Sequence, residues 1–291
     1  MIDFEITRLV LAFICGYFLT ISGSLSQLVS NNSLASPSTL GMDGAAVLLV
    51  LLSQLLVLTN LELPALEWFN LIFVIIASFV LYFVLQGRKQ KNIFTSGMDI
   101  KRVILFGLAF NLFIGAIFSI IQFLFMALNF DFPSGLWFGS IKQYEVTYLW
   151  PFGVSFCVTF LLVLKISPKI SLLNLGNEFA TGLGINVFRV QIISLMVAFF
   201  LNALVISFFG VFSFLGLIFP HILRSFKVFN KSMSKELLYG PLLCATIFAI
   251  IDLLCFNFVL YGAELPVGMV SSVIGAFFLI FLVLRSKISR A

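Results

Sequence analysis

Charged residues are scarce in this sequence. Only 10% of the 291 residues are charged, against about 25% in an average soluble domain, while 61% are hydrophobic and 37 are phenylalanine. This composition excludes a soluble globular domain and a disordered chain. The isoelectric point near 9.1 does not indicate a nucleic-acid binder, because the basic residues punctuate long uncharged runs instead of forming a basic face.

Residues that build catalytic and metal sites are also rare. The chain has one histidine, and no GxxxxGK[ST] motif that could hold ATP phosphates. Its four cysteines lie in apolar runs without a CxxC pair, so we expect them to pack in the interior: Cys15, Cys157, Cys244 and Cys255. We therefore expect no metal, no bound cofactor and no covalent chemistry on this chain, which disfavours an intramembrane enzyme.

The sequence consists mainly of long, uncharged apolar runs. A membrane-spanning helix needs roughly 20 apolar residues, and such runs occur at 9–42, 44–61, 68–87, 103–130, 146–164, 190–223, 237–251 and 265–284. The run 190–223 is too long for one span, and we divide it at Gly210 into 190–209 and about 211–226. The prediction is an all-α, polytopic transmembrane helix bundle of about nine spans with short loops, in one domain covering 1–291.

The positions of the charges predict the topology. All but two of the 17 lysine and arginine residues fall in four connections or tails, which the positive-inside rule places in the cytoplasm. Acidic residues mark the other connections, so the N-terminus is expected outside and the C-terminus inside. The uncharged segment 30–39 is placed inside by parity, with a buried, partly re-entrant turn as the alternative.

The most distinctive segment is 210–224, GVFSFLGLIFPHILR. It resembles the GxxxFxGLxxPHxxR signature of FecCD-type permeases, the membrane subunits of ABC importers for ferric siderophores, haem and vitamin B12. A lone histidine has no partners for a metal site, so we expect His221 to be structural. Together with the AELPxG match at 263–268, the signature positions are Gly216, Pro220, His221, Arg224, Glu264, Pro266 and Gly268.

Four further segments resemble the family in the same order along the chain. They are Arg8 with the following LVLAFICGYFLTISGSLSQ, the NPLAxPxxLG-like stretch 32–41, GLAFN at 107–111, and GNEFATGLG at 176–184. The resemblance runs from about Arg8 to Leu284. The family usually has one more span before the Arg8 segment, so this sequence starts at what would be the second.

The resemblance implies the type II ABC importer permease fold and two functional segments. The cytoplasmic segment 172–186 would form the short helices that seat in the ATPase, with Gly176, Glu178, Ala180, Leu183 and Gly184. The outer segment 130–145 would gate the pathway beneath the binding protein, and gating or docking would use Arg8, Trp137, Gly139, Ser140 and Lys142. Trp137 sits one residue closer to the glycine than in the family's WxxGS, and the family's RLPR is here EITR at 5–8.

The same resemblance implies the partners and the location. We expect a multi-pass protein of the bacterial cell membrane, a second permease (identical or a sibling chain), two ATPase subunits that bind ATP and magnesium, and an extracytoplasmic binding protein. No nucleic acid is expected. The cargo would be an iron chelate, most often a ferric siderophore, with haem or cobalamin as alternatives.

Polar residues within spans are candidates for the transport pathway, since such side chains usually face the bundle interior. They are Asn111, Gln122 and Asn202. An interhelical hydrogen bond is the alternative role for each. Ionisable groups within spans are few, with Asp252 the clearest, and no convincing internal repeat is present. An ion-coupled secondary carrier is therefore the less favoured function.

Overall fold

The computed structural model describes residues 2–39, 43–44, 100–127, 138–141, 149–226, 229, 232–260 and 263–288. Almost all of them are helical, and the sheet among them is a short antiparallel hairpin of β1 (Val259–Leu260) and β2 (Ala263–Glu264). The predicted all-α fold class is confirmed. The predicted spans 44–61 and 68–87 lie almost entirely outside the described residues.

The helices follow the uncharged runs closely. They are α1 (Ile2–Ser30), α4 (Ile100–Ala127), α5 (Leu149–Leu173), α6 (Asn177–Gly182), α7 (Val187–Phe209), α8 (Leu215–Ser225), α10 (Met233–Leu238), α11 (Gly240–Asn257) and α12 (Val267–Ile288). Among the described residues, five helical segments are long and apolar enough to cross a membrane, and α12 contributes a shorter apolar stretch. The count of about nine spans stays a prediction.

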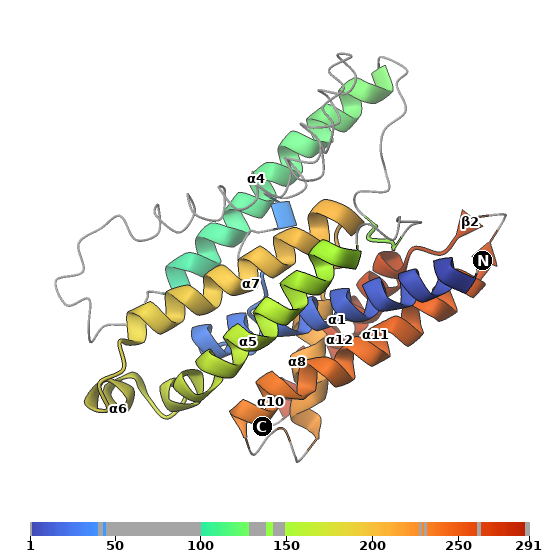
Figure 1. Cartoon of the computed structure of the whole chain (residues 1–291). Coiled ribbons are helices and arrows are strands. Elements are labelled where there is room, and N and C mark those ends of the chain that lie inside the picture. Colours follow the sequence, from blue (N-terminus) through green and yellow to red (C-terminus); the bar gives the residue numbers. More distant parts are fainter. Residues whose placement is uncertain are drawn as a thin grey trace.

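Helix α1 lies at the centre of the bundle. Figure 1 shows it in blue between α11 on one side and α5 and α7 on the other, and it also contacts α8. The ring of Tyr17 lies 4.6 Å from that of Phe156 in α5. Gly16 allows α11 to approach closely, because a Cβ there would lie 2.7 Å from the Cβ of Phe248. The first span is therefore a core element, and its buried face is continuous from end to end.

The predicted break at Gly210 is confirmed, but the second half is not a full-length helix. Gly210 has a φ of 82°, which glycine adopts without strain, and it ends α7. Helix α8 then has only 11 residues, or about 16 Å of length, roughly half a bilayer core. The stretch 210–214 before it is non-helical, so the second predicted span is a half-helix preceded by irregular backbone.

Two other expectations need correction. Helix α5 does not end with its uncharged run at 164 but continues to Leu173 with Pro168 inside it. The extra turns bury Ile170 and Leu173 in the region where α5 contacts α10, which offsets the hydrogen bond that proline cannot make. Among the cysteines, three are buried as predicted, whereas Cys157 is exposed on α5.

Candidate coupling and gating sites

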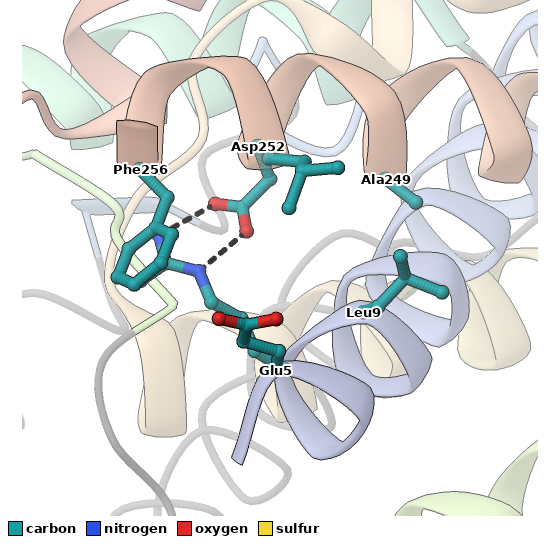
Figure 2. Close-up of a pocket in the computed structure, with 7 residues that line it drawn as sticks. Glu5, Leu9, Ala249, Asp252 and Phe256 are labelled. Carbon is teal, nitrogen blue, oxygen red and sulfur yellow. Dashed lines mark hydrogen bonds and ion pairs between the residues drawn. The ribbon is translucent and has the colours of Figure 1, made fainter. Parts of the chain in front are cut away.

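Arg8 is buried near the N-terminal end of α1, the end predicted to lie outside. Only 6% of its surface is exposed, and its guanidinium donates to Asp252 of α11 through Nε (2.8 Å) and Nη2 (3.2 Å) and to Glu264 of β2 through Nη1 (3.1 Å). The ring of Phe256 lies 4.3 Å from the guanidinium carbon. Figure 2 shows the carboxylate of Asp252 with its two hydrogen bonds, beside that ring. A bidentate, charge-assisted pair is among the strongest polar contacts available in an apolar setting.

This geometry changes the interpretation of Arg8. The family resemblance suggested that Arg8 meets the binding protein, yet its donors are directed to two carboxylates of its own chain. Docking through Arg8 stays a prediction, but the described contacts join α1 to the hairpin before α12. In this cluster the side chain of Glu264 is 48% exposed, so a binding partner could contact it. Asp252, the clearest ionisable group within a predicted span, is buried.

The AELPxG and gate motifs meet through their backbones. The Gly268 N–H donates to the carbonyl of Gly139 (2.7 Å), the Gly139 N–H to that of Val211 (3.0 Å), and the Ser140 N–H to that of Phe209 (2.9 Å). A Cβ at Gly268 would lie 2.5 Å from the nitrogen of Gly139. The segment 138–141 is therefore fastened to the break after α7 and to the start of α12, which satisfies the irregular backbone there. Trp137 and Lys142 lie outside the described residues.

The proline of the 210–224 signature has a specific structural consequence. Pro220 has no N–H, so the carbonyl of Gly216 loses its helical donor. That carbonyl faces α1 at Gly23, where a Cβ would lie 1.7 Å from the oxygen. Glycine at position 23 is thus required for the observed contact between α1 and α8.

The arginine and histidine of the signature differ in their surroundings. Arg224 donates from Nε to Glu236 of α10 (3.0 Å) and from Nη1 to Gln27 of α1 (2.8 Å). His221 has Nδ1 3.1 Å from the carbonyl oxygen of Leu217 and an edge-on ring contact with Phe278. These contacts agree with a structural role for His221. Arg224 instead joins three helices at the inner end of α1.

The segment predicted to contact the ATPase is a short helix bounded by two glycines. Gly176 (φ 126°) precedes α6 and Gly184 (φ 78°) follows it, and other residues rarely adopt either conformation. Ala180 is fully buried and faces the protein. Glu178 is exposed, and so is Leu183.

This segment also presents apolar side chains away from the protein. Leu175, Phe179 and Leu183 are 67%, 52% and 56% exposed, and all lie on the connection between α5 and α7. The basic residues of this region predict that the connection lies in the cytoplasm, where no lipid would cover it. An exposed apolar patch in water usually marks a protein contact. The arrangement fits the predicted ATPase contact, which stays a prediction.

Two of the three candidate pathway residues bind a re-entrant turn. After α1 the chain folds back, so that Pro37 comes close to Gly216 near the middle of the bundle. Asn111 of α4 donates to the carbonyl of Ser38 (2.5 Å) and accepts from the Gly44 N–H (3.1 Å). Within this segment residues 35–37 are buried, whereas Asn31, Ser33 and Leu34 are exposed, which fits the partly re-entrant alternative. The side of the membrane on which the segment lies stays a prediction.

The third contact of this turn comes from α7, where Asn202 donates to Asp43 (3.0 Å). Asn111 and Asn202 thus make the interhelical hydrogen bonds that were the alternative to lining a pathway. Gln122 lies on the exposed side of α4. Pathway lining by these three residues stays a prediction. Within the described ranges, no three metal-ligating side chains lie together.

These features define a class of protein: an integral membrane helix bundle with a break after α7 and exposed apolar side chains on the connection between α5 and α7. The chain belongs to the FecCD transport family, which it matches over residues 1–285.

Individual relatives agree with this assignment. The iron(3+)-hydroxamate import system permease protein FhuG of Bacillus subtilis (strain 168) is 28% identical over 99% of this chain and 84% of its own length. A protein named as a probable heme-iron transport system permease, IsdF of Staphylococcus aureus (strain Newman), is 25% identical over 100% of this chain and 84% of its own. A solved structure described as an inward-facing metal-chelate type ABC transporter has the same fold, with a TM-score of 0.79 and 20% identity over 96% of this chain and 85% of its own.

Proposed function

We propose that this chain is the membrane-spanning permease subunit of an ATP-binding cassette importer for iron chelates. The observation that carries the proposal is the family match over 1–285, supported by the exposed apolar side chains around α6. ATP hydrolysis belongs to a separate pair of ATPase subunits, and this chain binds no cofactor. A second permease completes the pathway, and an extracytoplasmic binding protein delivers the cargo.

The proposed mechanism is alternating access. ATP binding changes the spacing of the ATPases, and the 172–186 segment carries that movement to the spans. The coupling must be reciprocal, because a loaded binding protein that shifts the permease equilibrium also shifts the ATPase equilibrium. In this mechanism the segment 138–141, which is hydrogen-bonded to the end of α7, the break after it and the start of α12, responds to the binding protein.

A ferric siderophore of the hydroxamate class is the cargo that we favour, since one of the relatives is named for it. Haem is the second candidate because another relative is named for haem iron. Both are iron chelates, so the two candidates share the requirement for a wide pathway and differ in the ligand around the iron.

The test is uptake into proteoliposomes that contain the complete transporter with its binding protein. We expect ATP-dependent accumulation of a radiolabelled ferric hydroxamate, and none with a Walker-motif variant of the ATPase. Accumulation of haem but not the hydroxamate would reverse the cargo assignment. Accumulation driven by an ion gradient with this chain as the sole protein would contradict the proposed function.

A further inference from the structure

A short cytoplasmic helix, α10, links the end of α5 to the signature helix α8. Figure 1 shows α10 beside the inner end of α5 and directly before α11. The hydroxyls of Ser171 in α5 and Ser234 in α10 lie 3.0 Å apart. Only three residues, 174–176, separate the end of α5 from α6. The helix α10 is therefore in contact with the element that leads directly into the predicted ATPase contact.

The opposite side of α10 carries a buried carboxylate. Glu236 is 0% exposed, and its Oε1 accepts from Nε of Arg224 and lies 2.8 Å from Nη2. Nη1 of Arg224 reaches the Oε1 of Gln27, whose amide nitrogen donates to the carbonyl of Leu217 (3.3 Å). One guanidinium thus fixes α10, α8 and the inner end of α1 relative to one another.

A buried ion pair is a poor way to gain stability. Removing a carboxylate and a guanidinium from water costs several kcal/mol each, and well-packed apolar residues of similar volume are often as stable or more so. The second oxygen of Glu236 has no hydrogen-bond partner among the described residues. The pair instead fixes geometry. The planar guanidinium of arginine sets the relative orientation of both partners, which a lysine ammonium cannot do.

We propose that α10 is a transmission element, in which Ser234 and Glu236 pass the movement of the α5–α6 segment through Arg224 to α8 and α1. This inference rests on the proposed function, because it requires an ATPase that moves the 172–186 segment. Glu236 and Arg224 are positioning residues in it, since neither needs to touch cargo or nucleotide.

The experiment uses the complete transporter in proteoliposomes and measures two quantities: the stimulation of ATPase activity by loaded binding protein, and the ATP hydrolysed per chelate imported. For Glu236→Gln we expect a less stable transporter, because the change breaks a buried ion pair. In the assembled complex basal ATPase activity should be unchanged, while stimulation falls about five- to tenfold, the range of a modest coupling free energy. Glu236→Asp should retain part of the stimulation. Lys235→Gln, which removes a charge from the exposed side of the same helix, should behave as the native protein.

Two results would overturn the inference: a Glu236→Gln transporter with native stimulation and stoichiometry, or an equal loss in Lys235→Gln. If native protein imports no iron chelate with ATP, the proposed function fails instead, so the two failures are distinguishable.

A second measurement applies if Glu236→Gln does not assemble. The pair Ser171→Cys and Ser234→Cys, in a Cys157→Ser background, places two thiols where the hydroxyls now meet. Because α5 and α10 must move together in this scheme, oxidation of the pair should leave ATP-dependent import intact. Loss of import on oxidation and its return on reduction would show that the two helices move apart during transport, and would end the inference.

Discussion

The carbonyl oxygen of Gly216 occupies the place where a side chain at Gly23 would begin. A Cβ built on Gly23 lies 1.7 Å from that oxygen, 2.5 Å from the carbonyl carbon and 2.8 Å from the α-carbon of Gly216. All three are backbone atoms, so no rotamer change can relieve the contact.

Gly23→Ala should therefore separate α1 from α8. Overpacking typically costs about 1–3 kcal/mol, and we expect the upper end of that range because backbone must move. The measurement is the unfolding temperature of the purified protein in detergent. Gly115→Ala is the matched control, because nothing lies within 4 Å of a Cβ there; in a helix this change should be neutral or slightly stabilising. Equal tolerance of both substitutions would contradict the packing described.

The pair Arg8–Asp252 should depend on both partners. Asp252→Asn leaves a buried guanidinium without its main counter-charge, and breaking a buried pair in this way costs about 3–5 kcal/mol. The double variant Arg8→Met with Asp252→Leu should recover most of that loss. Glu264→Gln serves as the control, since its half-exposed side chain should contribute about 1 kcal/mol or less. Thermal unfolding of all three variants measures this; an Asp252→Asn protein as stable as native would show that the charge of Asp252 is not needed to hold the buried Arg8 guanidinium.

The exposed side chains on and after α6 should matter for coupling and not for folding. Glu178→Ala with Leu183→Ala should reduce the stimulation of ATPase activity by loaded binding protein about tenfold, with normal membrane insertion. Both side chains are exposed, so their loss leaves no cavity. Leu124→Ala is the control. Leu124 is an exposed leucine near the C-terminal end of α4, outside the 172–186 segment, so this change should have no such effect. If loaded binding protein stimulates the ATPase activity of the double variant as strongly as that of the native transporter, the assigned ATPase contact is wrong.

The predicted topology can be tested at one lysine. Lys142 follows the segment 138–141, which is bonded to the break after α7 and to the start of α12, and it is predicted to lie outside. Lys142→Cys, in a Cys157→Ser background, should be labelled in intact cells by a membrane-impermeant maleimide. A cysteine at Lys235 should be labelled only after permeabilisation. Protection of position 142 in intact cells would reverse the orientation.

The helices could be predicted from the sequence because their signal is local. An uncharged run of about 20 residues predicts a helix whatever its neighbours are, and Gly210 was identified as a reversal from run length. The half-helix α8 could not be foreseen, because hydropathy does not distinguish apolar helix from apolar irregular backbone. The family motifs supplied the positions of Arg8 and Arg224 but not their partners.

Those partners lie far away in the chain. Arg8 and Asp252 are 244 residues apart, and Gln27 and Arg224 are 197 apart. Periodicity carries no information at such separations. One signal was present, however: a buried arginine in a membrane must pair with an acid, and Asp252 was the clearest acid within a span. Arg8, however, precedes the first uncharged run at 9–42, so its burial and its pairing with Asp252 were not evident from the sequence.

The separation of Arg8 from Asp252 also bears on how the protein is made. At about 5–20 residues per second, a ribosome needs roughly 10–50 s to reach the aspartate after the arginine has been synthesised. During that interval the arginine of the first helix has no main counter-charge. The turn after this helix also lacks the hydrogen bonds of Asn111 and Asn202 until those residues have been synthesised. The nascent chain must therefore be sheltered by the insertion machinery, or keep Arg8 at the lipid headgroups, until α11 is released from the ribosome.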